Sequence, residues 1–151
     1  MTEIAAFLER KGLVLRSGGS SGADMAFEAG VSNAANKEIY LPWKGFNMST
    51  SPLYGVTPLA LEMAAEFHPA WEECSTGARE LHARNCYQVL GRGLDDPCKF
   101  VVCWTVGGKS IGGTAQAMRV AARYRVPVFN LAKKADYDFV EECMRTEQIF
   151  A

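Results

Sequence analysis

Two stretches of the chain combine the residue types that bind phosphate groups. The first, SGGSSGAD at residues 17–24, places three glycines and three serines ahead of or beside an acid. The second, GGKSIGGT at residues 107–114, contains four glycines, a lysine, a serine and a threonine. Glycine lets a ligand approach the backbone, and hydroxyl side chains donate hydrogen bonds. Two such loops at one site would both contact the same phosphorylated ligand.

The elements around both loops favour this interpretation. Each loop follows an apolar segment, at 13–15 and at 100–104, that is predicted as a strand. Each precedes a predicted helix, at 23–29 and at 114–124. Ligands of open α/β sheets bind beyond the carboxyl ends of the strands, where helix N-termini offer free N–H groups. The alternative, that each loop is only a tight turn between strand and helix, stays open.

The remaining pattern alternates helices and strands. Further strands are predicted at 37–41 and 126–131, and further helices at 2–11, 58–67, 77–90 and 136–145. Alternation of this kind predicts an α/β fold with a largely parallel sheet. With 151 residues and 48% hydrophobic composition, residues 1–151 are expected to form a single domain.

Composition excludes several classes of function. A net charge of −1 gives no reason to expect binding to nucleic acid or to a membrane surface. Five cysteines without a CxxC pair indicate reduced thiols, and neither a secretory signal nor a long apolar segment is present, so a cytoplasmic protein is expected. The sequence GKS at 108–110 lacks the first glycine that a P-loop needs, which disfavours a P-loop nucleoside triphosphatase. No cofactor is predicted.

Several single residues have two interpretations. Asp24 lies near the first turn of the helix after the first loop, where it either caps N–H groups or binds a ribose hydroxyl. Arg84, beside Asn85, either binds a ligand phosphate or lies on a solvated helix face. His68 and His82 lie 14 residues apart with no carboxylate or cysteine at ligand spacing, so no metal site is expected.

Aromatic residues near strand ends also have two interpretations. Trp43 and Phe46 lie in a loop after a predicted strand, and Trp104 directly follows another. Each ring would either stack on a base or pack against the protein.

The motifs SGGSSGAD-x-x-F-E-x-G and GGTAQAMRVAARYRVPVFNL together resemble the SLOG superfamily of Rossmann-like nucleotide-binding proteins. That superfamily includes the DNA-processing protein A domain and the LONELY GUY hydrolases. KEIYLPWKGFN and ARNCYQVLG are similar to a branch of small phage and prophage proteins. The resemblance covers residues 1–131 and implies a Rossmann-like parallel sheet with helices on both faces. The ligand-binding residues then expected are Ser17, Gly18, Gly19, Ser20, Gly22, Asp24, Arg84, Asn85, Gly112, Gly113 and Thr114.

The chain departs from the family pattern in two places. Members of this branch usually have another strand, with a G-S-R-like loop, before the helix that here begins at Thr2. Without that strand the sheet lacks a member near its middle, so either the chain is an internally started or truncated form, or another segment or subunit fills the gap. The hydrolases also carry a glutamate three residues after the threonine of P-G-G-x-G-T-x-x-E, where this chain has Ala117. Glu28 and Glu80 are the acids considered as replacements.

Three hypotheses follow. The first is a protein that senses or sequesters a nucleotide or nucleotide-derived ligand, as a homodimer or higher oligomer. The second is an N-glycoside hydrolase of nucleoside 5′-monophosphates, with Asp24 or Glu28 as the carboxylate and Arg84 or Arg119 on the phosphate. The third is a structural domain without a working site.

Overall fold

A computed structural model describes residues 1–150 and has the predicted alternation of helices and strands. The strands are β1 (Leu15–Ser17), β2 (Lys37–Ile39), β3 (Val101–Cys103) and β4 (Val128–Asn130). The helices are α1 (Thr2–Arg10), α2 (Ala23–Gly30), α3 (Pro58–Phe67), α4 (Thr76–Leu90), α5 (Thr114–Arg123) and α6 (Lys134–Arg145). The α/β fold class is confirmed.

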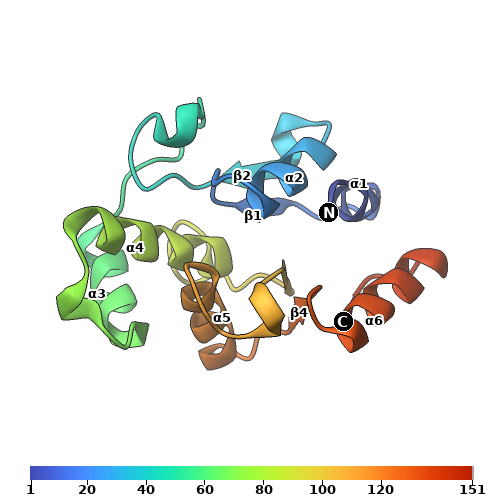
Figure 1. Ribbon diagram of the computed structural model, residues 1–151. Coiled ribbons are helices and arrows are strands. Elements are labelled where there is room, and N and C mark those ends of the chain that lie inside the picture. Colours follow the sequence, from blue (N-terminus) through green and yellow to red (C-terminus); the bar gives the residue numbers. More distant parts are fainter. Residues whose placement is uncertain (151) are drawn as a thin grey trace.

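The strands form two separate parallel pairs. β1 pairs with β2, with Leu15 opposite Lys37, and β3 pairs with β4, with Val101 opposite Val128. Within residues 1–150 no ladder joins β1 to β3. Figure 1 shows the β1–β2 half, with α1 and α2, set apart from the half that holds α4, α5 and β4. The predicted gap in the middle of the sheet is therefore present.

Helices cover both faces of the strands, as predicted. Val101 and Val128 pack against a cluster formed mainly by α3, α4 and α5. Their neighbours Val102 and Phe129 point the other way and pack against residues of α1, α2 and α6. Successive strand residues point to opposite faces, so β3 and β4 each contribute to both clusters.

Helix ends agree with the sequence signals more closely than strand ends do. The Ser75 hydroxyl accepts a hydrogen bond from the Ala78 N–H at 3.2 Å and caps α4. Leu13, predicted to begin a strand, instead donates its N–H to the Leu8 carbonyl at 3.0 Å and closes α1. Gly12, with a φ of +82°, makes that closure sterically easy. β1 therefore begins only at Leu15.

None of the helices within residues 1–150 is both long enough and apolar enough to cross a membrane.

Candidate functional site

A cavity of about 1120 Å³ lies between the two halves of the sheet. Residues 13–17, around β1, line one side, and residues 98–104, around β3, line the other. Both glycine-rich loops reach this cavity at the carboxyl ends of the strands. The residues that they contribute are Ser17, Ser20, Ser21 and Asp24 from the first loop and Gly112, Gly113 and Thr114 from the second. Two segments about ninety residues apart in sequence thus share one site.

The Arg84 guanidinium holds the first loop in place. Its side chain comes from α4 and is only 4% exposed. Nη1 donates to the carbonyl oxygens of Gly18 and, at 3.2 Å, of Tyr40, and Nε donates to the Asn85 Oδ1 at 3.0 Å. Burial lowers the pKa of Arg84 to about 10, while Asp24 opposes that shift, so the group is charged at neutral pH. The alternative of a solvated helix face is wrong.

Asn85 holds the second loop. Its Nδ2 donates to the Gly113 carbonyl at 3.0 Å. Adjacent residues of one helix therefore fasten the two loops, Arg84 the first and Asn85 the second. The dipeptide lines the cavity as well as joining its walls.

Asp24 acts within the first loop. Its Oδ2 accepts a hydrogen bond from the Ser20 N–H at 3.1 Å. Gly22 is the N-cap residue of α2, and the start of this helix has no capping hydrogen bond from a side chain. The predicted capping of α2 by Asp24 is therefore wrong, because the carboxylate fixes the loop ahead of the helix instead. Asp24 also lines the cavity, where it is available to a ligand hydroxyl.

The glycines of the two loops have different surroundings. A Cβ on Gly18 would come within 2.7 Å of Arg84 Nη1, and one on Gly19 within 2.8 Å of Leu41 Cδ2. Gly18, Gly19 and Gly22 do not line the cavity. Gly112 and Gly113 do, and a Cβ on either would meet no atom within 4 Å. The open backbone that faces the cavity is thus at Gly112 and Gly113.

The aromatic residues also form two groups, one packed against the protein and one facing the cavity. Trp43 and Phe46 pack edge to face with ring centroids 5.3 Å apart, and Phe46 lies 5.4 Å from the Arg84 guanidinium carbon. Trp104 lines the cavity and is 49% exposed. Trp104 is therefore the aromatic ring that is free to stack on a planar ligand.

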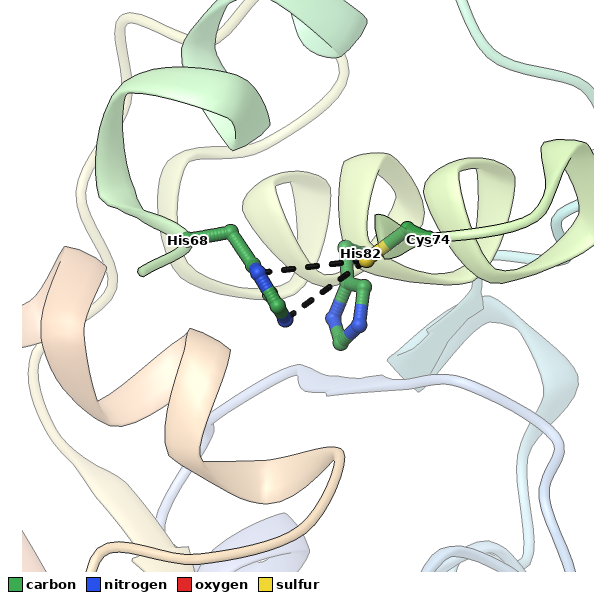
Figure 2. Close-up of side chains that lie close together, drawn as sticks. All are labelled: His68, Cys74 and His82. Carbon is green, nitrogen blue, oxygen red and sulfur yellow. Dashed lines mark hydrogen bonds between the residues drawn. The ribbon is translucent and has the colours of Figure 1, made fainter. Parts of the chain in front are cut away.

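Three residues that sequence reasoning did not connect lie together near the cavity. His68 and His82 line it, and their ring centroids are 4.3 Å apart. Cys74 lies beside them, with its sulfur 3.9 Å from both ring nitrogens of His68 (Figure 2). The prediction that no cysteine lies at ligand spacing is wrong for Cys74, because the loop between α3 and α4 folds back on itself. The H-x5-C-x7-H spacing was the available signal.

No protein-family model, no curated protein and no solved structure matches the chain.

Proposed function

We propose that this protein binds a nucleotide or nucleotide-derived ligand in the cavity and so senses or sequesters it. The observation that carries the proposal is the meeting of both glycine-rich loops at one cavity, beyond the carboxyl ends of β1 and β3. Ligand sites of parallel α/β sheets lie at this edge. The resemblance to the SLOG superfamily, in its phage and prophage branch, agrees with this location.

The loop residues suit the parts of a nucleotide. A phosphate would lie against Gly113 and Thr114, where the N-terminus of α5 adds the positive end of its dipole. The buried charge of Arg84 adds to the positive potential at the first loop. Asp24 would accept a hydrogen bond from a ribose hydroxyl, and the exposed Trp104 ring would stack on the base.

Hydrolysis of an N-glycosidic bond is the weaker candidate. Ala117 lines the cavity, so the position that holds glutamate in the LONELY GUY hydrolases faces the site with a methyl group only. Glu28 and Glu80 do not line the cavity. Asp24 is the one acid of the two loops there, and it already accepts the Ser20 N–H. Binding without turnover therefore fits these side chains better.

Self-association and a cytosolic location are part of the same proposal. The cavity-facing edges of β1 and β3 have no strand partner within residues 1–150, and unpaired edges favour pairing with another segment or subunit. All five cysteines are free thiols, as suits a reducing compartment. Light scattering coupled to gel filtration measures self-association, and we expect a mass above that of one protomer.

Mass spectrometry of small molecules released from the denatured protein tests the binding proposal, together with a thermal-shift panel of nucleotides. We expect at least one nucleotide to raise the melting temperature, and Gly113→Val to remove that rise by filling open space. Gly77→Val is the matched control, because Gly77 also lies at a helix start but does not line the cavity. An empty protein that no nucleotide stabilises would overturn the proposal, and release of free base would establish hydrolysis.

A further inference from the structure

The loop between α3 and α4 gathers three side chains that ligate transition metals. His68 follows the last residue of α3, Cys74 precedes the N-cap of α4, and His82 lies in the second turn of α4. Their ligand atoms all lie within 4.8 Å of one another. Figure 2 shows the three side chains converging, with the sulfur of Cys74 beside the two imidazole rings.

One of these potential ligand atoms has no hydrogen-bond partner within residues 1–150. His82 Nδ1 is buried and makes no hydrogen bond with any part of residues 1–150. Buried polar atoms are nearly always paired, and an unpaired one calls for an explanation such as an ion or an ordered water. The unpaired nitrogen belongs to the same cluster, so one bound ion would satisfy it.

The protonation states also suit a metal ion. Burial, followed by the charges of His68, Arg119 and Arg84, lowers the pKa of His82 to about 4. Burial and the charge of Arg119 lower the pKa of His68 as well. Both shifts favour the neutral imidazole, which is the form that binds metals. The nearby guanidinium charges oppose a cation, and a Cys74 thiolate would offset part of that repulsion.

The distances are close to those of a real centre. Zinc binds cysteine sulfur at about 2.3 Å and histidine nitrogen at about 2.0–2.1 Å, so tetrahedral ligands lie about 3.5 Å apart. The Cys74 sulfur lies 3.9 Å from each His68 nitrogen and all the ligand atoms lie within 4.8 Å of one another, so rotation of the side chains has to bring them onto an ion. The Nδ1 of His68 accepts the Ala70 N–H at 3.0 Å, and a metal at Nδ1 would replace that donor.

The protein holds the loop in this shape. The Arg79 guanidinium, from α4, donates to the Trp71 carbonyl through Nε at 3.3 Å and Nη2 at 3.0 Å. The same guanidinium lies 5.0 Å from the Trp71 ring. Since Trp71 lies between His68 and Cys74, these contacts keep both ligands close to His82 without a metal. The cluster is therefore organised in advance.

We propose that His68, Cys74 and His82 bind one divalent transition-metal ion of the zinc class. Cys74 loses its thiol proton to solvent on binding, and the sulfur and two nitrogens fill three of four tetrahedral positions. Because His68 and His82 line the cavity, the fourth position is left for water or a ligand there. This inference is independent of the proposed nucleotide binding and extends beyond it.

Titration of the full chain with Co²⁺, in the absence of nucleotide, tests the inference. We expect one equivalent to bind, with a thiolate-to-cobalt charge-transfer band and the visible bands of tetrahedral cobalt. Cys74→Ser should remove the charge-transfer band, whereas Cys98→Ser, at another partly buried thiol, should retain it. A wild-type protein without the band, or a band that survives in Cys74→Ser, would overturn the inference.

Zinc provides a second measurement that does not depend on the cobalt spectrum. After equilibrium dialysis against Zn²⁺, elemental analysis should find one zinc per chain in the wild type. His82→Gln should weaken zinc binding at least tenfold, and circular dichroism verifies that this variant is folded. Equal zinc binding by folded His82→Gln and wild type would contradict the assignment.

Discussion

The two glycine-rich loops have similar compositions but different surroundings. In the first loop, Gly18 and Gly19 are packed against Arg84 and Leu41, and the Gly19 carbonyl accepts a hydrogen bond from Asn47 at 3.0 Å. In the second, Gly113 has open space around its Cα, and its carbonyl accepts the Asn85 amide at 3.0 Å and the Gln116 N–H at 3.3 Å. Gly18 and Gly19 thus serve packing, whereas Gly113 leaves room for a ligand.

Among the substitutions that test this comparison, replacing Arg84 should have the largest effect on the free energy of unfolding. Arg84→Leu leaves the carbonyl oxygens of Gly18 and Tyr40 without their donor and removes a partner of Asn85. Buried unpaired groups cost about 1–3 kcal/mol each, so we expect a loss of about 3 kcal/mol or more in the free energy of unfolding. Urea denaturation measures it.

The control for that variant is Arg123→Leu on the exposed side of α5. Its free energy of unfolding should stay within about 0.5 kcal/mol of the wild type. If Arg84→Leu were as stable as this control, Arg84 would not be the group that fixes the first loop.

An added methyl group should destabilise the fold in the first loop and leave its stability nearly unchanged in the second. Gly18→Ala places a Cβ against the buried Arg84 guanidinium and should destabilise the fold by about 1–3 kcal/mol. Gly113→Ala meets open space at an ordinary φ of −62° and should change stability by less than about 0.5 kcal/mol. Thermal denaturation of the pair compares them directly, and equal losses would remove the distinction between the loops.

The smallest expected effect concerns Asp24. Asp24→Asn weakens the charge-assisted bond from the Ser20 N–H and should cost about 1 kcal/mol of stability. Glu28→Gln is the matched control, because Glu28 lies on the same helix and does not line the cavity. A control variant that loses as much stability as Asp24→Asn would mean that the Ser20 contact contributes little.

The sequence predicted which segments would meet but not how their side chains are used. Strand-loop-helix order placed both loops at one edge of the sheet, and Ser75 marked the start of α4. The identity of a glycine's neighbour depends on tertiary structure, since Gly18 packs against a side chain 66 positions away. For the same reason Arg84 could not be recognised as a buried donor to backbone carbonyls.

Short-range signals also failed where the chain turns back on itself. The α1 closure at Leu13 depends on a left-handed Gly12, which delays β1 by two residues. The cluster of His68, Cys74 and His82 depends on the path of the loop between α3 and α4. The H-x5-C-x7-H spacing contains the three residues but does not by itself predict that they converge.

Isothermal titration of one nucleotide against single-residue variants of each loop tests the central claim most directly. The nucleotide is the one that most raises the melting temperature, and the variants are Ser20→Ala in the first loop and Thr114→Val in the second. Each hydroxyl removed should weaken binding by about tenfold while the stoichiometry and the melting temperature of the free protein stay unchanged. Unchanged affinity in either variant would contradict a ligand held by both loops.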